Sequence, residues 1–277
     1  MPATPPADAA AITALLSGSR NVWHVIRTTP ETGSTNADVA TLASTAADEG
    51  LVLIAEHQTS GRGRLDRTWT APPGSSLAIS ALLRPGRPLQ DWTWLPLLTG
   101  LAVSRAVRRA APTPELANRV LVKWPNDVLV TDAAGPGVPG KLCGILLERH
   151  ETPTGPAAII GLGLNIDLAP DDLPVPTATS LAGVGFDADK NRIVAALLDE
   201  LAELYGLWQR RGHLVEAYQR ECGTIGQQVR VELSPTQSVH GTATGVDEQG
   251  RLLVRTPDGL QAFSAGDVYH LRPSGSQ

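Results

Sequence analysis

Residues 61–69 concentrate side chains that bind anions and flat rings. The segment is Gly61-Arg62-Gly63-Arg64-Leu65-Asp66-Arg67-Thr68-Trp69, with three arginines, two glycines and a tryptophan. Glycine lets backbone N–H groups approach a ligand, a guanidinium binds carboxylate or phosphate oxygens in pairs, and an indole ring stacks on another ring. We call this segment the arginine loop. Its composition suits a nucleotide bound together with an acid.

Two simpler interpretations of the arginine loop are a solvated surface loop and an RG-type contact with RNA. RG-type contacts usually occur as repeats in basic, low-complexity segments. This segment occurs once and follows an apolar run at residues 51–56 that is typical of a buried strand. The context therefore favours a ligand site over both alternatives.

A second polar cluster is Lys123-Trp124-Pro125-Asn126-Asp127, at the end of an apolar strand-like run. Proline, asparagine and aspartate are common in plain turns for local reasons. A plain turn does not require the lysine and tryptophan before them. The amide and the carboxylate could instead bind an adenine edge or hold Mg²⁺.

Residues 135–141 match the GxxxxGK skeleton of a P-loop, but the match is misleading. A P-loop continues with Ser or Thr and a helix, whereas Leu142 follows here and residues 141–148 predict a strand. We interpret the segment as a hairpin turn that places Lys141 at the start of a core strand, with Gly144 leaving room for a ligand. Residues 161–165, Gly-Leu-Gly-Leu-Asn, lack the third glycine of a dinucleotide fingerprint and also predict a strand.

Lysine is rare in this chain. Of 23 basic residues only Lys123, Lys141 and Lys190 are lysines. An ammonium is compact and mobile where a guanidinium is a rigid fork, so the two are not equivalent. Two of the three lysines fall inside the motifs above.

Composition indicates a globular protein with a sizeable core. The chain has 277 residues, 42% of them hydrophobic, and a formal net charge of −5, which argues against a surface that coats nucleic acid. No apolar run approaches the ~18 residues of a membrane span, and the start lacks the features of a signal peptide. We expect a cytoplasmic protein without membrane or DNA partners. Cys143 and Cys222 are too few for a disulfide scaffold.

The motifs need a framework of strands and helices. Alternation of apolar residues and helix-capping side chains predict both kinds of element in the first 223 residues. Strands are expected at 22–28, 51–56, 76–83, 120–123, 128–131, 141–148 and 158–166, and helices at 37–47, 95–110, 191–211 and 214–222. The run of strands between 120 and 166 predicts hairpins instead of βαβ units.

From residue 225 onward the pattern changes to brief alternating strands with turns, at 228–233, 239–246, 251–256 and 260–264. This predicts a separate small β-barrel. We therefore expect a poorly ordered segment at 1–20, a catalytic domain at 21–223 and a small β domain at 224–273.

The motifs together, in this order, resemble the biotin protein ligase family. The resemblance rests on Gly33-Ser34-Thr35-Asn36, Gln58, the arginine loop, residues 123–127, residues 141–148 and residues 161–165, and extends from about residue 30 to the end. It implies an α/β (α+β) catalytic domain built on a mixed sheet, as in lipoate ligases, followed by an SH3-like barrel.

The resemblance also implies a role for each motif. It assigns three overlapping sets of residues. Biotin would be bound by Ser34, Thr35, Asn36, Gln58, Arg62, Gly63, Arg64, Lys141, Gly144, Gly161 and Gly163. ATP would be bound by Arg62, Arg67, Trp69, Lys123, Asn126, Asp127 and Asn165. Lys141 and Arg64 would be the catalytic residues. No metal is expected from the protein alone, since Mg²⁺ would come with ATP, near Asp127 and Asn165.

The implied activity is ATP-dependent formation of biotinyl-5′-AMP, followed by transfer of biotin to a lysine of a biotin carboxyl carrier protein. The absence of a Ser/His/Asp or Cys/His arrangement agrees with a reaction that needs no enzyme nucleophile. About thirty residues precede Ser34, without a basic helix, so ligase activity without operator binding is expected. A lipoate ligase and a non-catalytic nucleotide-binding module are the alternatives.

Overall fold

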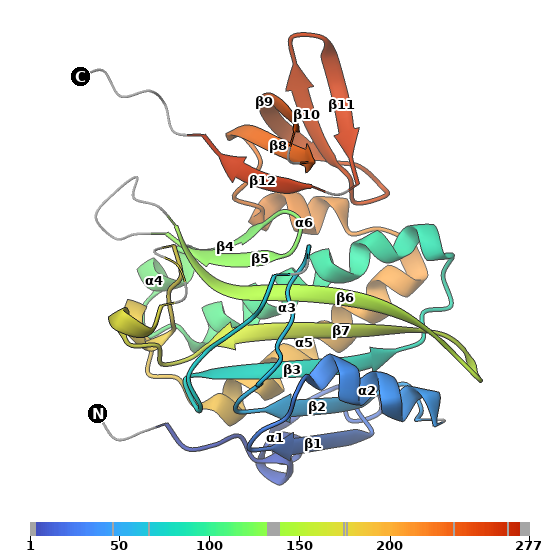
Figure 1. Cartoon of the computed structure of the whole chain (residues 1–277), viewed down its shortest axis with the longest axis vertical. Coiled ribbons are helices and arrows are strands. Elements are labelled where there is room, and N and C mark those ends of the chain that lie inside the picture. The colour runs from blue at the N-terminus through green and yellow to red at the C-terminus, as the bar shows by residue number, and fades with distance from the viewer. Residues whose placement is uncertain are drawn as a thin grey trace.

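The computed structural model describes residues 4–45, 47–65, 67–131, 139–173, 175, 177–234, 236–264 and 266–271. These residues form a seven-stranded sheet covered by helices and, near the C-terminal end, a second sheet of five strands (Figure 1). None of the helices in the described ranges is long and apolar enough to span a membrane.

The large sheet is mixed. Its strands are β1 (Val25–Thr29), β2 (Leu51–Ala55), β3 (Ser76–Leu83), β4 (Val120–Lys123), β5 (Asp127–Val130), β6 (Gly140–Thr152) and β7 (Gly155–Asn165), in the spatial order β1-β2-β3-β7-β6-β5-β4. Strands β1 and β2 pair in parallel, and the remaining neighbours are antiparallel. The predicted hairpins between residues 120 and 166 are thereby confirmed, apart from the turn at 132–138, which lies outside the described residues.

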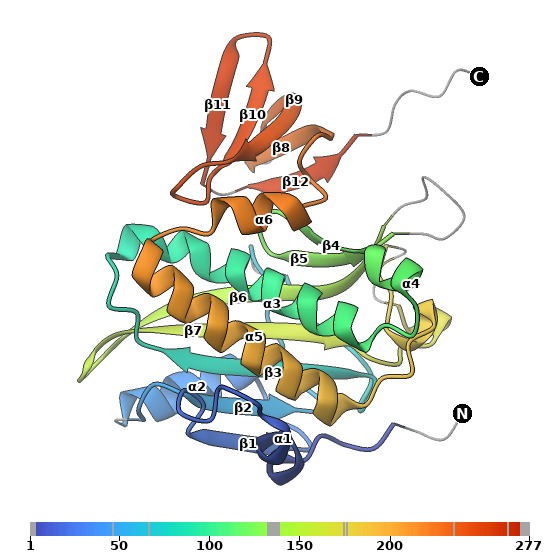
Figure 2. The same ribbon diagram turned by 180° about the vertical axis from the view of Figure 1, so that it is seen from behind.

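Helices cover one face of this sheet more completely than the other. The helices are α1 (Ala9–Leu15), α2 (Thr35–Ser44), α3 (Trp94–Ala110), α4 (Pro114–Asn118), α5 (Lys190–Arg211) and α6 (Val215–Glu221). Figure 2 shows α3 and α5 side by side across the back of the sheet. Their apolar stripes are buried there, as the 3.6-residue periodicity of a surface helix requires. On the front, α2 lies over one end of the sheet and leaves β6 and β7 partly uncovered (Figure 1).

The small sheet has one strand more than the sequence predicted. It consists of β8 (Gln228–Ser234), β9 (Gln237–Val246), β10 (Leu252–Thr256), β11 (Gly259–Phe263) and β12 (Asp267–His270), in the order β11-β10-β9-β8-β12. Strand β12 returns to pair with β8 and is an edge strand. The fold class, an α/β domain on a mixed sheet followed by a small β domain, agrees with the prediction.

The N-terminal segment differs from the expectation of poor order at residues 1–20. Residues 4–20 include α1, which is capped by the side chain of Asp8 and packs against α5 with Ile12 buried. Asp199 of α5 accepts hydrogen bonds from Ser17 and Ser19. The alanine- and proline-rich composition gave no sign of these contacts, because their partners lie about 180 residues away in the chain.

Candidate functional site

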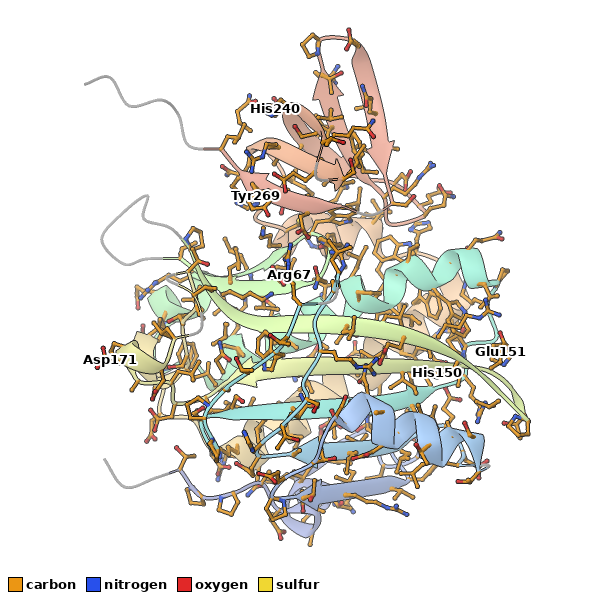
Figure 3. All side chains as sticks on the ribbon, viewed as in Figure 1. Arg67, His150, Glu151, Asp171, His240 and Tyr269 are labelled. Carbon is orange, nitrogen blue, oxygen red and sulfur yellow. The ribbon has the colours of Figure 1, made fainter. Side chains whose placement is uncertain are left out.

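The motifs predicted from the sequence meet in one cavity of about 940 Å³. It lies on the face of the large sheet opposite α3 and α5, between α2, the arginine loop and the small sheet (Figures 1 and 3). The predicted site residues that line it are Ser34, Thr35, Asn36, Gln58, Arg62, Gly63, Arg64, Arg67, Trp69, Lys123, Asn126, Asp127, Lys141, Gly144, Gly161, Gly163 and Asn165. The structure therefore brings the whole predicted set together, while the role of each residue stays a prediction.

One end of the cavity is built from uncharged polar side chains, and we call it the neutral end: Ser34, Thr35, Asn36, Gln58 and Ser80. Ser34 caps α2, which places the next two residues at the start of the helix and at the cavity wall. Gln58 Oε1 accepts hydrogen bonds from Thr35 N at 2.8 Å and from Thr35 Oγ1 at 3.0 Å.

Ser80 of β3 completes this hydrogen-bond network from the large sheet. Its hydroxyl is fully buried and lies 2.6 Å from Asn36 Oδ1 and 2.7 Å from Thr35 Oγ1. A buried hydroxyl needs such partners, because leaving it unpaired costs about 1–3 kcal/mol. The neutral end is thus fixed in position by its own hydrogen bonds. Ser80 was not among the predicted site residues, because it stands in an apolar strand without any motif around it.

Glu148 of β6 joins the neutral end to the arginine loop. Its carboxylate accepts a hydrogen bond from Asn36 Nδ2 at 2.6 Å and one from Arg62 Nη2 at 3.0 Å, and Arg62 Nη1 lies 3.0 Å from its other oxygen as an ion pair. This paired geometry fixes the guanidinium in orientation as well as position. Arg62 therefore lies at the neutral end. Glu148 had no assigned role before the structure placed it there.

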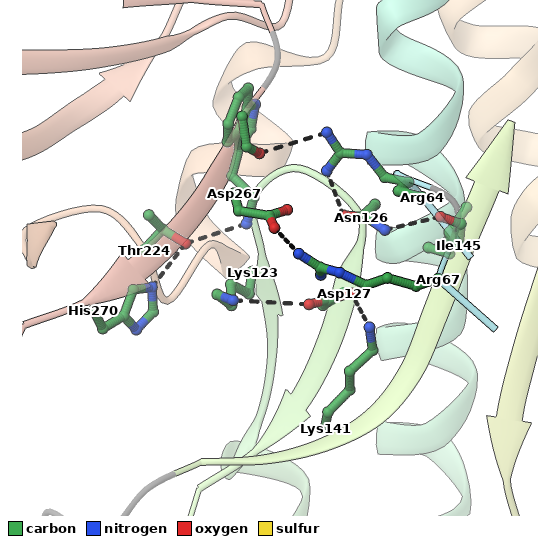
Figure 4. Close-up of polar contacts among 12 residues, drawn as sticks. Arg64, Arg67, Lys123, Asn126, Asp127, Lys141, Ile145, Thr224, Asp267 and His270 are labelled. Carbon is green, nitrogen blue, oxygen red and sulfur yellow. Dashed lines mark hydrogen bonds and ion pairs between the residues drawn. The ribbon is translucent and has the colours of Figure 1, made fainter. Parts of the chain in front are cut away.

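The opposite end of the cavity carries charge, and we call it the charged end: Arg64, Arg67, Lys123, Asp127 and Lys141. Lys141 Nζ lies 2.7 Å from Asp127 Oδ1, and Lys123 Nζ lies 3.8 Å from Asp127 Oδ2 (Figure 4). Burial lowers the pKa of Lys123, an effect that Asp127 opposes and Lys141 reinforces. Two ammonium groups thus share one carboxylate, which leaves positive charge available to an anionic ligand.

The arginine loop reaches from the large sheet to the small one at the charged end. Arg64 donates to Asn126 Oδ1 at 2.9 Å and to the carbonyl oxygen of Gly266 at 3.5 Å, and Arg67 forms an ion pair with Asp267 (Figure 4). Burial lowers the pKa of Arg64 in spite of the nearby carboxylates. Burial is the largest single influence on the pKa of Arg67 and acts to lower it, but the hydrogen bonds and charges of Asp267 and Tyr269 together outweigh it and the pKa rises.

Trp69 closes the middle of the cavity. A Cβ atom added at Gly163 would lie 2.3 Å from its ring, and one added at Gly144 would lie 2.9 Å from it. The room beside Gly144, which we expected a ligand to use, is therefore taken by the Trp69 ring and the Lys141 side chain. Among the described residues, the buried indole N–H of Trp69 has no hydrogen-bond partner, and a Cβ atom added at Gly163 would lie 2.5 Å from its nitrogen.

The small sheet supplies lining residues that the sequence analysis missed. Asp267, Tyr269 and His270 of β12 all face the cavity, and Figure 3 shows Tyr269 above Arg67. Burial, followed by the charge of Lys123, lowers the pKa of His270 to about 4, so the ring is neutral at pH 7. His270 Nε2 lies 3.1 Å from Thr224 Oγ1 (Figure 4). The predicted four-stranded pattern ended at residue 264 and therefore excluded this strand.

The predicted Mg²⁺ position near Asp127 and Asn165 can be tested against strand register. Asp127 is paired with Gly144 and Gly144 with Gly163, two residues before Asn165. Two strand spacings and two residues separate the Cα atoms by about 12 Å, so both side chains could reach one Mg²⁺ at ~2.1 Å only if each is fully extended toward the other. The shared position therefore stays a prediction. No cluster of three metal-ligating side chains occurs in the described ranges. The donor set suits a magnesium ion held mainly by a ligand's phosphates, with Asp127 as one protein carboxylate.

Two family models match separate parts of the chain. Residues 21–165 match the biotin/lipoate A/B protein ligase family, and residues 224–271 match the biotin protein ligase C-terminal domain. The first range contains every predicted site residue. The second contains β12 and its cavity-lining side chains.

Related sequences and structures agree with these matches. The chain is 41% identical to biotin–[acetyl-CoA-carboxylase] ligase of Mycobacterium tuberculosis over 97% of both chains. It is 32% identical to the bifunctional ligase/repressor BirA of Bacillus subtilis over 85% of this chain and 70% of that protein. The structure of a biotin protein ligase from Aquifex aeolicus in complex with biotin and ATP superimposes with a TM-score of 0.71 at 24% identity, covering 90% of this chain and 99% of that one.

Proposed function

The chain belongs to the biotin/lipoate A/B protein ligase family, and from this we propose that it is a biotin–[acetyl-CoA-carboxylase] ligase. It activates biotin with ATP as biotinyl-5′-AMP and then transfers the biotinyl group to a lysine of a biotin carboxyl carrier protein. The observation that carries the proposal is the single cavity that joins a neutral hydrogen-bonding end to a cluster of cations. We further propose that the catalytic domain spans residues 21–223 and the small domain residues 224–273, a division supported by one family match that begins at residue 21 and a second that begins at residue 224.

The neutral end suits the uncharged ring system of biotin. A cyclic urea offers one carbonyl acceptor and two N–H donors, which hydroxyl and amide groups can satisfy without charge. Thr35, Asn36 and Gln58 present such groups at the cavity wall. Ser80 holds Thr35 and Asn36, and Thr35 in turn holds Gln58. We assign the biotin ring to this end and its carboxylate to the side facing Lys141.

The charged end suits the first half-reaction. A carboxylate oxygen of biotin attacks the α-phosphorus of ATP, forming a C–O–P bond while the bond to pyrophosphate breaks, so two anions must be brought together. Lys141 and Arg64 offset this repulsion in a site that is already organised. Mg²⁺, arriving with ATP, supplies further positive charge to the phosphates. Arg67, Lys123 and the indole of Trp69 remain for the nucleotide.

The second half-reaction needs no enzyme nucleophile. The neutral amine of the carrier lysine attacks the acyl carbon, the bond from that carbon to AMP breaks, and the amine proton is lost to solvent. The residues that hold the adenylate need only orient it and exclude water until the carrier arrives. The arginine loop is placed for this role, because it crosses the cavity and is anchored at the small sheet through Arg67.

One experiment separates this proposal from its alternatives. The purified chain is mixed with ATP, Mg²⁺, an apo biotin-carrier domain and either biotin or lipoate, and the mass of the carrier is measured. We expect a mass gain with biotin and none without ATP. A gain with lipoate alone would establish a lipoate ligase. Nucleotide binding without transfer of either acid would support a non-catalytic module.

A further inference from the structure

Lys190 is the one lysine of this chain that stands outside the cavity. It is the first residue of α5, and only 1% of its side chain is exposed. Its Nζ lies 2.5 Å from Glu56 Oε2 and 3.0 Å from the carbonyl oxygen of Gly74. In a chain with only three lysines among its 23 basic residues, a fully buried ammonium with these two partners needs a specific explanation.

The two partners of Lys190 stand at the two ends of the connection that carries the arginine loop. Glu56 directly follows β2, and Gly74 lies two residues before β3. A backbone hydrogen bond joins the same two residues, because Gly74 N donates to the carbonyl oxygen of Glu56 at 3.2 Å. One ammonium group therefore fixes the start and the end of the connection, residues 57–73, which contains Gln58 and the whole arginine loop.

Glu56 also connects this point to the N-terminal segment. Its second carboxylate oxygen, Oε1, accepts a hydrogen bond from Ala7 N at 2.7 Å, and Asp8 N donates to Asn191 of α5 at 2.8 Å. The carboxylate thus binds α5 through one oxygen and the N-terminal segment through the other. Helix α5, the N-terminal segment and the base of the loop therefore form one polar junction, whose residues Glu56, Gly74 and Lys190 are not among those that line the cavity.

The residue types at this junction favour positioning over stability. A buried ion pair gains little over a well-packed apolar pair, because both charges lose their water, but it accepts only a narrow range of geometries. An ammonium offers three donors from one compact atom, which suits a carboxylate and a carbonyl that approach from different directions.

We propose that Lys190 is a positioning residue for the arginine loop: it fixes both ends of the connection so that the loop closes at one defined height over the bound adenylate. The proposal rests on the proposed function, because it assigns the loop the task of retaining biotinyl-5′-AMP. Without the contacts of Lys190 to Glu56 and Gly74, which we call the clamp, the loop would still carry its arginines but would open more often.

The test compares variants of the full chain. Lys190→Met removes the ammonium and keeps the shape, and Glu56→Gln removes the charge of its partner, in case the first variant does not fold. Each protein is loaded with biotin, ATP and Mg²⁺, and single-turnover pyrophosphate release and the dissociation rate of biotinyl-5′-AMP are measured separately. We expect adenylate dissociation to be faster by about two- to thirtyfold in both variants, the range of effects from residues that do not touch the ligand. Pyrophosphate release should change less.

Glu200→Gln is the matched control, because Glu200 is another buried charge of α5, paired with Arg105 and Arg109 and away from the connection. It should lower the melting temperature without changing adenylate dissociation. Unchanged dissociation in both clamp variants, or an equal increase in the control, would overturn the role of Lys190. A wild-type chain that releases no pyrophosphate with biotin would instead overturn the proposed function.

Discussion

The two ends of the cavity differ in how they are assembled. The neutral end is contained in the large domain, and its hydroxyl and amide groups are hydrogen-bonded to one another before any ligand binds. The charged end takes its cations from β4, β6 and the arginine loop, and one of its carboxylates from the small sheet. One end is a rigid receptor within a domain, and the other depends on how a loop and a second domain are placed.

This difference follows from the chemistry at each end. A neutral ring is recognised by hydrogen bonds whose geometry must be fixed, and a fixed network loses little entropy on binding. Phosphates are bound by charge, which acts over longer distances and tolerates movement. A loop that opens to admit ATP and to meet a carrier protein can therefore contribute arginines without losing function. Binding of the biotin ring should depend mainly on the neutral end, and chemistry on the charged end.

Substitution of Lys141 by alanine should have the largest effect. The variant loses the cation at the acid–phosphate junction, and we expect single-turnover pyrophosphate release to fall by about 10²- to 10³-fold, as for other preorganised electrostatic groups. Biotin binding measured by calorimetry should weaken much less. Arg149→Ala, on the same strand but paired with exposed Glu151, is the control and should behave as wild type. Near-normal pyrophosphate release by Lys141→Ala would show that the charged end does not perform the chemistry.

Gly161→Ala tests the neutral end. The added Cβ would lie 2.2 Å from Asn36 Oδ1, so the Asn36 side chain must move away from Ser80 and Glu148. We expect KM for biotin to rise about five- to thirtyfold, equivalent to the ~1–2 kcal/mol of one misplaced hydrogen-bonded group, with KM for ATP unchanged. Gly86→Ala, where an added Cβ meets nothing within 4 Å, is the control. An equal rise in both KM values would mean that the two ends are not separate.

Asp267→Asn tests the contribution of the small domain. The variant weakens the ion pair with Arg67, whose side chain is 59% exposed, so a modest rise of about two- to fivefold in KM for ATP is expected, with KM for biotin unchanged. Glu232 lies opposite Asp267 in the β8–β12 register and pairs with Arg230. Glu232→Gln should have no effect on either KM. An equal rise in KM for ATP in both variants would show that the effect does not depend on the position of Asp267 at the cavity.

The comparison also explains what could be predicted from the sequence. The strands and helices of the large domain follow from local alternation and capping, as at Ser34, and the site motifs are contiguous segments with unusual composition. The small domain's edge strand was missed because its short run, Asp267–His270, pairs with β8 through contacts that leave no local signal. The Arg67–Asp267 pair spans 200 residues of chain, and Ser80 and Glu148 stand in ordinary strand sequence. Functional residues could be predicted where one contiguous segment contains them, and could not be predicted where they depend on contacts between distant segments.

His270 should have the smallest effect, on stability at acid pH. Burial and Lys123 hold its pKa at about 4 in the folded chain, below the usual 6.5 of histidine. Above pH 6.5 the ring is neutral in both states and has no influence. As pH falls from 6.5 to 4 the unfolded chain takes up the proton first, so the free energy of unfolding decreases, and below 4 the effect levels off. Because the ring is partly exposed, we expect a contribution of only about 1–2 kcal/mol.

In His270→Gln, the melting temperature should decline less steeply between pH 6.5 and 4 than in wild type, whereas His240→Gln in the same sheet should keep the wild-type slope. Equal slopes in all three proteins would show that His270 is not held neutral by burial and by the charge of Lys123 in the folded chain.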